Sequence, residues 1–390
     1  MRVLSFGTYD AEVHPRIRVL IEGLRTNGVH VVECNAPLGL STARRVDTLK
    51  KPWLVPAMMA RIVSRWVRLT RDARRYRGRH RPDAVLVGYM GHFDVLLARL
   101  LFPRVPIFLD HLISGATTAA DRGVDGGLRS VVLRQLDQAA VRAADVVIVD
   151  TEEHRSLVPE DRRDAAVVVP VGAPRTWFAA RPADLAARPA DAAARPADAA
   201  RRTDATARTA DAPLSVIFFG LFTPLQGTPV IGEAIRILHR RGAPVRFTLV
   251  GSGQDAETVH ELVDGLDTVS WTDWVRGAEL PALVAEHDVS LGIFATTPKA
   301  LRVIPNKVYQ GAAAGTAVVT SDTAPQRRVL HEAAILVPPG DPVALADALE
   351  RLADDGGRLR HHRALTADLA DAAFTPASVV RPILARLRTP

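Results

Sequence analysis

The chain has 390 residues, of which 47% are hydrophobic and 24% are charged, and it contains a single cysteine, Cys34. This length exceeds what one hydrophobic core usually serves and predicts two domains, whereas the lone cysteine excludes an internal disulfide framework. No apolar run approaches the about 20 residues that a membrane-spanning helix needs. Met1–Gly7 has the pattern of a strand and loop rather than of a signal peptide. We therefore expect a cytoplasmic protein, either soluble or peripheral at the inner face of the cell membrane.

The net charge of +7 is not spread evenly along the chain. Residues 50–81 contain eleven Lys and Arg residues against one carboxylate, Asp72, which gives this segment alone a charge of +10. Because the surplus is local, it favours one anionic partner for this surface, such as a membrane, over general nucleic-acid binding.

Short apolar runs alternate with helical patterns throughout, which is typical of doubly wound α/β domains with strands buried on both faces. In the first half the predicted strands are Arg2–Phe6, His30–Cys34, Ala84–Gly88, Pro106–Leu109, Val146–Asp150 and Ala166–Val169. The predicted helices between them are Pro15–Thr26, Pro56–Tyr76, Asp94–Leu101 and Leu128–Ala143. We assign residues 1–175 to an N-terminal Rossmann-like domain.

The predicted helix Pro56–Tyr76 is amphipathic. Its apolar positions are Met59, Ile62, Val63, Trp66, Leu69, Thr70 and Ala73, and its basic positions include Arg61, Arg65, Arg68 and Arg75. Two interpretations remain open: a helix packed on the domain with a solvated basic face, or a helix that docks on an anionic membrane with Trp53 and Trp66 as interfacial anchors.

A low-complexity segment separates the two halves. Arg-Pro-Ala-Asp recurs at 181–184, 188–191 and 195–198. No large apolar residue recurs and proline interrupts each copy, so the spacing of seven does not indicate a coiled coil. We predict a disordered linker over residues 176–212.

The second half again has the α/β pattern. The predicted strands are Ser215–Phe219, Arg246–Val250, Thr268–Trp271, Val289–Ile293, Ala317–Thr320 and Ala334–Val337. We assign residues 213–374 to a C-terminal Rossmann-like domain. Residues 375–390 form a predicted helix that can belong to either domain.

The segment Pro298–Gly315 has the chemistry of an anion site. Asn306 can cap a helix that begins at Lys307, and a helix N-terminus offers free N–H groups and partial positive charge. Lys299, Arg302 and Lys307 add three cations within nine residues. An ordinary capped helix with basic residues is the alternative.

Two glycine loops follow predicted strands of the second half. Gly251-Ser-Gly253-Gln-Asp-Ala resembles a dinucleotide-binding fingerprint, but it follows the second strand, and Asp255 would place a carboxylate where a pyrophosphate lies. We therefore favour a tight turn facing a nucleotide over a dehydrogenase site. The loop Gly220–Gly227 follows the first strand of the domain.

Taken in order, these segments resemble the nucleotide-sugar-binding domain of family 4 glycosyltransferases, over nearly all of residues 214–355. The matching motifs are strand–Gly–loop–Gly at 216–227, V-G-S-G at 250–253, W-T-D-W-V at 271–275, H-D-V-S-L-G at 287–292, R-V-I-P-N-K-V-Y-Q-G-A-A-A-G at 302–315 and L-V-P-P-G-D-P at 336–342. The resemblance implies a GT-B fold, with two Rossmann-like domains facing across a cleft. It also implies a nucleotide diphosphate sugar as donor and retention at the anomeric carbon.

The chain departs from this family at charged positions. Leu221 and Gln226 stand where many relatives carry an Arg and a Lys, and Arg302 and Gln310 stand where a pair of glutamates is usual. We expect the helix N-terminus and its cations to compensate. The predicted donor-binding residues are Gly220, Gln226, Gly251, Gly253, Trp274, Val275, Lys299, Arg302, Asn306, Lys307 and Gln310.

Polar residues of the first half gather after predicted strands, although each alone also suits a cap or a turn. The predicted acceptor-side residues are Gly7, His14, Arg16, His92, Asp94, Asp121 and Arg122. The resemblance implies a catalytically important His or His-Asp near Asp110-His111, so we predict His111 and Asp110 as catalytic residues.

No D-x-D stands at a strand end and no His/Cys cluster has metal spacing, so we expect no metal and no cofactor besides the nucleotide sugar as co-substrate. The predicted function is transfer of a sugar to an acceptor hydroxyl of a small molecule or a lipid-linked glycan. A GT-B sugar-nucleotide epimerase and a non-catalytic nucleotide-sugar-binding protein are the alternatives, and we expect no nucleic-acid partner.

Overall fold

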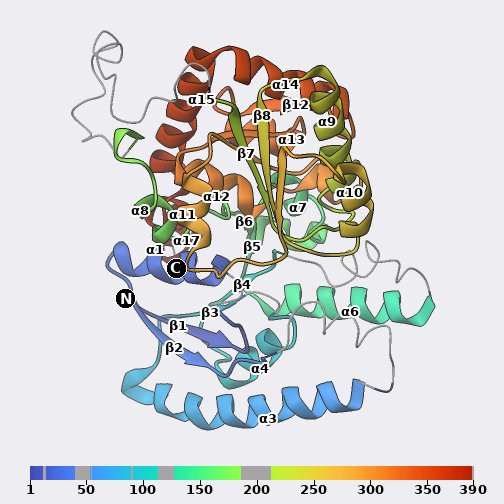
Figure 1. Cartoon of the computed structure of the whole chain (residues 1–390). Coiled ribbons are helices and arrows are strands. Elements are labelled where there is room, and N and C mark those ends of the chain that lie inside the picture. Colours follow the sequence, from blue (N-terminus) through green and yellow to red (C-terminus); the bar gives the residue numbers. More distant parts are fainter. Residues whose placement is uncertain are drawn as a thin grey trace. The chain divides into compact units, whose positions relative to one another are not determined.

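The computed structural model describes residues 1–11, 15–39, 53, 55–88, 91–112, 127–185 and 212–388. The chain forms two compact units, which are Met1–Val171 with Pro376–Pro390, and Gly172–Thr375 (Figure 1). We call them the N-terminal and the C-terminal unit. Among the described helices, none combines the length and the apolar character needed to cross a membrane.

The N-terminal unit contains a six-stranded parallel sheet in the order β2-β1-β3-β4-β5-β6. The strands are β1 Arg2–Gly7, β2 His30–Asn35, β3 Ala84–Val87, β4 Ile107–Asp110, β5 Val146–Val149 and β6 Ala166–Val168. The helices are α1 Pro15–Thr26, α3 Val55–Ala73, α4 Asp94–Leu101, α6 Gly127–Ala143, α7 Glu152–Arg155, α16 Pro376–Val379 and α17 Arg381–Arg388.

Helices cover both faces of this sheet because successive strand residues point to opposite sides. In β3, Val85 and Val87 pack in the core under α3, α4 and α6, whereas Leu86 packs in the core under α1, α16 and α17. This arrangement explains why the strand appears in the sequence as a continuous apolar run.

The C-terminal unit contains a second six-stranded parallel sheet in the order β12-β11-β10-β7-β8-β9. The strands are β7 Leu214–Phe219, β8 Val245–Val250, β9 Val269–Thr272, β10 Val289–Leu291, β11 Ala317–Ser321 and β12 Ile335–Val337. The helices are α8 Arg175–Ala179, α9 Thr228–Arg241, α10 Ala256–Val263, α11 Leu280–Ala285, α12 Asn306–Ala314, α13 Ala324–Leu330, α14 Pro342–Asp354 and α15 Gly356–Leu369. All twelve predicted strands therefore occur, and no strand end differs from its prediction by more than two residues.

The C-terminal helices α16 and α17 belong to the N-terminal unit. Val380 and Ile383 are buried in the core that α1 covers, and a Cβ at Gly23 would lie 2.0 Å from the carbonyl oxygen of Pro376. The structure thus resolves the open assignment of residues 375–390: from Pro376 onward they pack beside α1.

The predicted linker begins too early. Residues 176–185 are folded within the C-terminal unit, where Trp177 is buried and stacks on Phe219 at 5.5 Å between ring centroids. Arg181 is 8% exposed and donates to the carbonyl oxygens of Ala313 and Leu185. The first Arg-Pro-Ala-Asp copy has the composition of the others, so composition could not reveal its burial. Residues 186–211 lie outside the described residues.

Arg181 should matter for stability, unlike the arginine at the same position of the next copy. Its guanidinium also pairs with Asp371 at 2.8 Å. We expect Arg181→Ala to lower the free energy of unfolding by about 2–3 kcal/mol, because it leaves one buried carbonyl, one half-buried carbonyl and a half-buried carboxylate without their donor. Urea denaturation measures this loss. Arg188→Ala is the matched control and should be neutral; equal losses in both variants would contradict the assignment.

Candidate functional site

The carboxyl ends of the strands in the C-terminal unit meet at one edge of the sheet, since every strand is parallel to its neighbours. Ligands of open α/β sheets bind at such an edge. The loops Gly220–Gly227 and Gly251–Gly253 leave the ends of β7 and β8 there, so the structure brings the two predicted glycine loops together.

These loops touch through their backbones. A Cβ at Gly251 would lie 1.9 Å from the carbonyl oxygen of Gly220, and one at Gly253 would lie 2.4 Å from that of Phe222. Phe222 N–H also donates to the carbonyl oxygen of Ser252 at 3.0 Å. The glycines are therefore required for close packing of one loop on the other.

Lys307, from the first turn of α12, extends to the loop after β7. Its ammonium lies 2.6 Å from Gln226 Oε1 and 3.6 Å from the centre of the Phe218 ring, and a Cβ at Gly220 would lie 3.2 Å from Nζ. The residue is only 6% exposed, and this burial holds the pKa of Lys307 well below its ordinary value. Both contacts are neutral, so a bound anion would supply the missing counter-charge.

Helix α12 begins one residue earlier than expected. It starts at Asn306, and Pro305 precedes it without a side-chain cap, so the prediction that Asn306 caps the helix is wrong. Proline, with its fixed backbone angle, provides the extended residue before the first turn. Val308 N–H of the first turn donates to the carbonyl oxygen of Pro305 at 3.0 Å. The aligned peptide dipoles leave this end of α12 partially positive.

Small residues let α12 pack close to the sheet. A Cβ at Gly311 would lie 2.0 Å from Ser290 Oγ of β10. Lys299 and Arg302 are half-buried in the segment that leads into α12, and Gln310 is half-buried within it. The cations and Gln310 therefore lie on one short stretch of chain.

Trp271 is an aromatic residue at this edge that sequence reasoning missed. Its indole Nε1 donates to the carbonyl oxygen of Gly251 at 3.1 Å, and its ring stacks on Phe222 at 4.5 Å and on His260 at 3.7 Å. Trp274, predicted with Val275 to bind the donor, is 71% exposed. The pattern W-T-D-W alone could not tell which tryptophan contacts the glycine loop.

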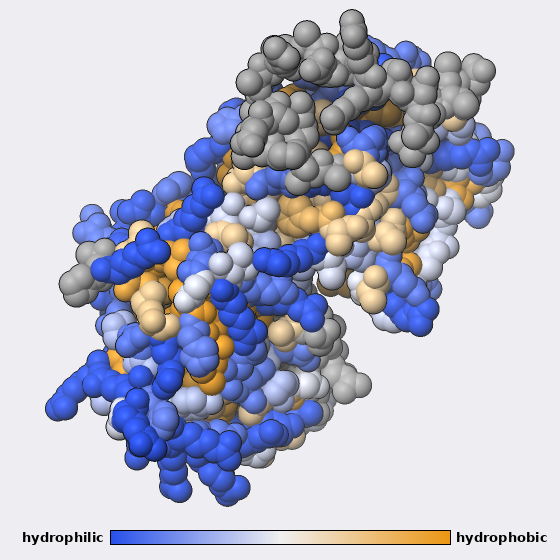
Figure 2. All heavy atoms as spheres, turned by 90° about the vertical axis from the view of Figure 1, so that its left-hand side faces the viewer, coloured by the Kyte–Doolittle hydropathy of each residue, from blue (hydrophilic) through white to orange (hydrophobic). Residues whose placement is uncertain are grey.

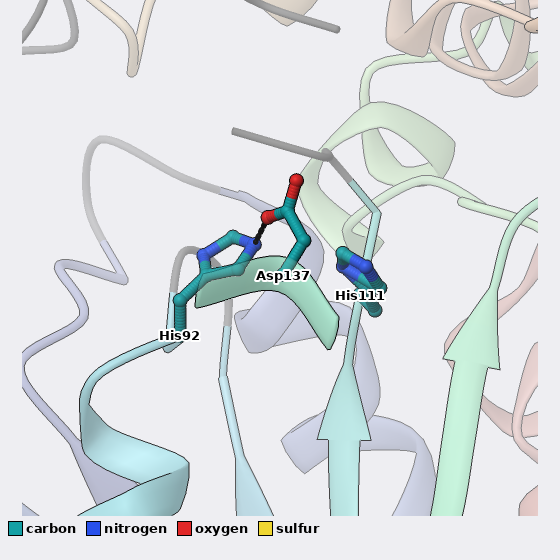
Figure 3. Close-up of side chains that lie close together, drawn as sticks. All are labelled: His92, His111 and Asp137. Carbon is teal, nitrogen blue, oxygen red and sulfur yellow. Dashed lines mark ion pairs between the residues drawn. The ribbon is translucent and has the colours of Figure 1, made fainter. Parts of the chain in front are cut away.

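A second polar cluster lies at the strand ends of the N-terminal unit (Figure 3). It consists of His92 before α4, His111 after β4, and Asp137 on α6. The two imidazole rings lie 5.2 Å apart, edge to face, and His92 Nε2 lies 3.0 Å from Asp137 Oδ1. Asp137 was not predicted, because it lies in the middle of a helix, far in sequence from either histidine.

His111 is neutral in this cluster. Burial first, and then the neighbouring His92, lower the pKa of His111 to about 3, so the imidazole carries no charge at neutral pH. Its ring can accept a hydrogen bond from a hydroxyl group or bind a cation.

Asp110 does not pair with His111. Its carboxylate lies 3.3 Å from Nε of the buried Arg16, which also donates to the carbonyl oxygens of Val169 and Pro170. Burial raises the pKa of Asp110, and Arg16 opposes this rise. The pair therefore connects α1, β4 and the end of β6, and the predicted site roles of Asp110 and Arg16 stay predictions.

Asp94 is also occupied within the fold. Its Oδ2 accepts from the amide and the hydroxyl of Thr8, and its Oδ1 accepts from Trp66 Nε1 at 3.1 Å. A Cβ at Gly7 would lie 2.9 Å from Asp94 Oδ2, so glycine is needed for this approach. Asp94 starts α4 without capping it, and it holds the loop after β1 in place. His14, Asp121 and Arg122 lie outside the described residues.

Comparisons with known proteins agree with this architecture. Residues 213–355 match the family model described as glycosyl transferases group 1. No curated protein matches the chain.

Solved structures are similar over the whole chain. The Anabaena protein HepE in complex with UDP has 14% identity and a TM-score of 0.64, covering 100% of this chain and 99% of its own. Sucrose-phosphate synthase from Thermosynechococcus elongatus has 15% identity and a TM-score of 0.67, covering 99% and 98%. A glycosyltransferase from Rickettsia africae has 12% identity and a TM-score of 0.61, covering 99% and 97%. At these identities the likeness shows the fold, which is the two-domain α/β fold of GT-B glycosyltransferases.

The contact between the glycine loops gives a testable prediction. We expect Gly251→Ala to lower the free energy of unfolding by about 2–4 kcal/mol, because the new Cβ collides with a backbone oxygen that cannot rotate away. Gly265→Ala is the matched control, since its φ of +72° is also positive but nothing lies within 4 Å of the added Cβ. The control should cost about 1 kcal/mol. Equal losses in a denaturant titration would show that backbone angle alone matters.

Proposed function

We propose that the protein transfers a sugar from a nucleotide diphosphate donor held by the C-terminal unit to an acceptor hydroxyl bound by the N-terminal unit. The observation that carries this proposal is the buried Lys307, beside the α12 N-terminus and the glycine loop after β7. The match of residues 213–355 to group 1 glycosyl transferases supports it independently.

The charge at this edge suits a diphosphate. The first-turn N–H groups of α12 and the ammonium of Lys307 are positive, and Lys307 has a neutral amide and a neutral ring as contacts. Lys299 and Arg302 precede the helix and add further positive charge. These groups would stabilise the leaving diphosphate without a metal at the donor.

Lys307 replaces the cation that the glycine loop lacks. Gln226 stands at the position where the resemblance to family 4 implies a lysine, and the Lys307 ammonium lies 2.6 Å from that side chain. We propose that a positive charge occupies the place of that lysine side chain, and that α12 supplies it instead of the loop. The resemblance further implies retention at the anomeric carbon.

His111 would act on the acceptor side of the reaction. A neutral, nearly buried imidazole can accept a hydrogen bond from an acceptor hydroxyl and orient its oxygen. Asp110 and Arg16 would hold the end of β4, and thereby His111, in position.

Incubation with labelled nucleotide sugars tests the function. UDP-glucose is the first donor to use, because one of the similar solved structures has it bound; GDP-, ADP- and dTDP-sugars follow. Each donor is incubated with and without a small-molecule or lipid extract. Label in a new product only with the extract supports transfer. Release of an epimerised sugar without acceptor would indicate an epimerase, and binding without turnover would indicate a non-catalytic protein.

Removal of the Lys307 charge should weaken nucleotide binding. We expect Lys307→Ala to cost about 1.5–3 kcal/mol in nucleoside diphosphate affinity, the value of a charge-assisted hydrogen bond. Lys307→Met keeps most of the apolar contact with Phe218 and should lose about as much. Calorimetry measures the affinities, and wild-type affinity in the Met variant would contradict a role for the charge.

The protonation of Lys307 gives a second readout. An anion raises the pKa of a buried lysine, so binding should take up a proton between the lowered pKa of the free protein and the raised pKa of the complex. The observed binding enthalpy then changes with the ionisation enthalpy of the buffer. Lys307→Met should abolish this dependence, which a purely structural lysine would not show.

We further propose that α3 docks on an anionic membrane, which would suit a lipid-linked acceptor. Ile62 and Leu69 are buried, so the helix packs on the sheet, but Val63 and Val67 are 56% exposed one turn apart. Exposed arginines flank this apolar pair, and Trp53 is 72% exposed. Figure 2 shows hydrophilic side chains along the lower edge of the N-terminal unit, where α3 lies in Figure 1.

Vesicle sedimentation tests the docking. Binding should require anionic lipid, fall with salt, and drop when Arg61, Arg65 and Arg68 become Gln, since each cation near the surface contributes about 1 kcal/mol. The matched control changes three exposed arginines of the C-terminal unit, Arg236, Arg240 and Arg246, to Gln. Equal binding to neutral and anionic vesicles, or equal effects of the two triple variants, would reject docking through α3 and favour a soluble acceptor.

A further inference from the structure

We propose that His92, His111 and Asp137 form a binding site for a transition-metal dication of the zinc type in the N-terminal unit. Each side chain offers one ligand atom, and these atoms all lie within 4.8 Å of one another (Figure 3). Two imidazole nitrogens and one carboxylate oxygen are a donor set that proteins use for zinc and for other first-row metals.

The hydrogen bonding of the histidines supports a ligand between them. Among the described residues, neither His92 Nε2 nor His111 Nδ1 has a hydrogen-bond partner, although both atoms are buried. His92 Nε2 lies 3.0 Å from Asp137 Oδ1, but the contact does not have the geometry of a hydrogen bond. Buried polar atoms are rarely left without a partner, and a cation at the centre of the cluster would satisfy both nitrogens.

The dimensions of the cluster suit a dication after a small movement. Zinc–ligand bonds of about 2.0–2.2 Å place neighbouring ligand atoms about 3.4 Å apart in a tetrahedral site. The His92–Asp137 contact, at 3.0 Å, is already this short, and no other pair of ligand atoms is more than 4.8 Å apart. Three protein ligands leave one position for water or for a hydroxyl-bearing ligand.

The three ligands come from elements that the fold brings together. His92 lies between β3 and α4, His111 follows β4, and Asp137 projects from α6, so the site spans the strand-end edge of the sheet. This site is separate from the donor residues of the C-terminal unit, and it departs from the expectation, made from the sequence, that the chain holds no metal. Its existence does not depend on the proposed function.

Metal titration of the full-length, tag-free protein tests the proposal. After chelator treatment and dialysis, the protein is titrated with Zn²⁺ alone against a chromophoric competitor. We expect one tight equivalent, and a dissociation constant at least about tenfold higher in His92→Gln, His111→Gln and Asp137→Asn, since even outer-shell changes cost about 10–100-fold. His154→Gln is the matched control, because His154 lies close enough to influence His111 but is not a ligand.

Two further measurements keep the test decisive if a variant unfolds. Zn²⁺ should raise the melting temperature of the wild type and of His154→Gln. X-ray absorption of the wild-type zinc protein should show scattering from two imidazole rings. Absence of stoichiometric binding, unchanged affinity in all three ligand variants, or a zinc spectrum without imidazole scattering would overturn the proposal.

Discussion

The approach of the Gly251 backbone to the carbonyl oxygen of Gly220 is the contact on which the candidate donor site depends. It lets the loops after β7 and β8 lie against each other, and it places the Gly251 carbonyl within reach of the Trp271 indole. The same loop passes beside the Lys307 ammonium, which a side chain at Gly220 would crowd. The position of the cation therefore depends on two residues that have no side chains.

Three buried basic residues of the described chain differ in their partners, and this difference distinguishes structural ion pairs from a candidate binding site. Arg16 has Asp110 as a partner and Arg181 has Asp371, so both charges are balanced within their own unit. Lys307 contacts an amide oxygen and an aromatic ring, and burial lowers its pKa. The charged form of a lysine in such surroundings is unfavourable in the free protein and becomes favourable when an anion binds beside it. This behaviour is expected at a binding site.

The sequence predicted the fold well because parallel strands buried on both faces produce continuous apolar runs. It also placed the glycine loops and Lys307 at the same edge, since strand order and carboxyl ends follow from the α/β pattern. Partners that are distant in sequence could not be predicted. Arg16 and Asp110 are 94 positions apart and Asp94 and Thr8 are 86 apart, so neither contact could be inferred from the order of residues along the chain.

Predictions from local sequence patterns were also wrong where a residue type is common in more than one structural role. Asn306 and Asp94 are common capping residues, but neither caps its helix, because each lies inside the first turn. Arg181 belongs to the first copy of a repeat, and the later copies have the same composition and are still predicted to be a linker. In each case the residue type suited the predicted role. The residue's actual role depends on neighbours in the folded structure, which the sequence does not show.

The two clusters at strand ends differ in charge, and the difference follows from their chemistry. Positive groups lie at the strand-end edge of the sheet in the C-terminal unit. They would stabilise a diphosphate both when it binds and when it leaves. The N-terminal edge instead holds two imidazoles around one carboxylate, with His111 neutral through burial. Such a set binds a hydroxyl group or a dication but has little attraction for a phosphate. Under the two proposals, each Rossmann-like unit would use the same edge of its sheet for a ligand of different charge, as suits a transferase that binds donor and acceptor separately.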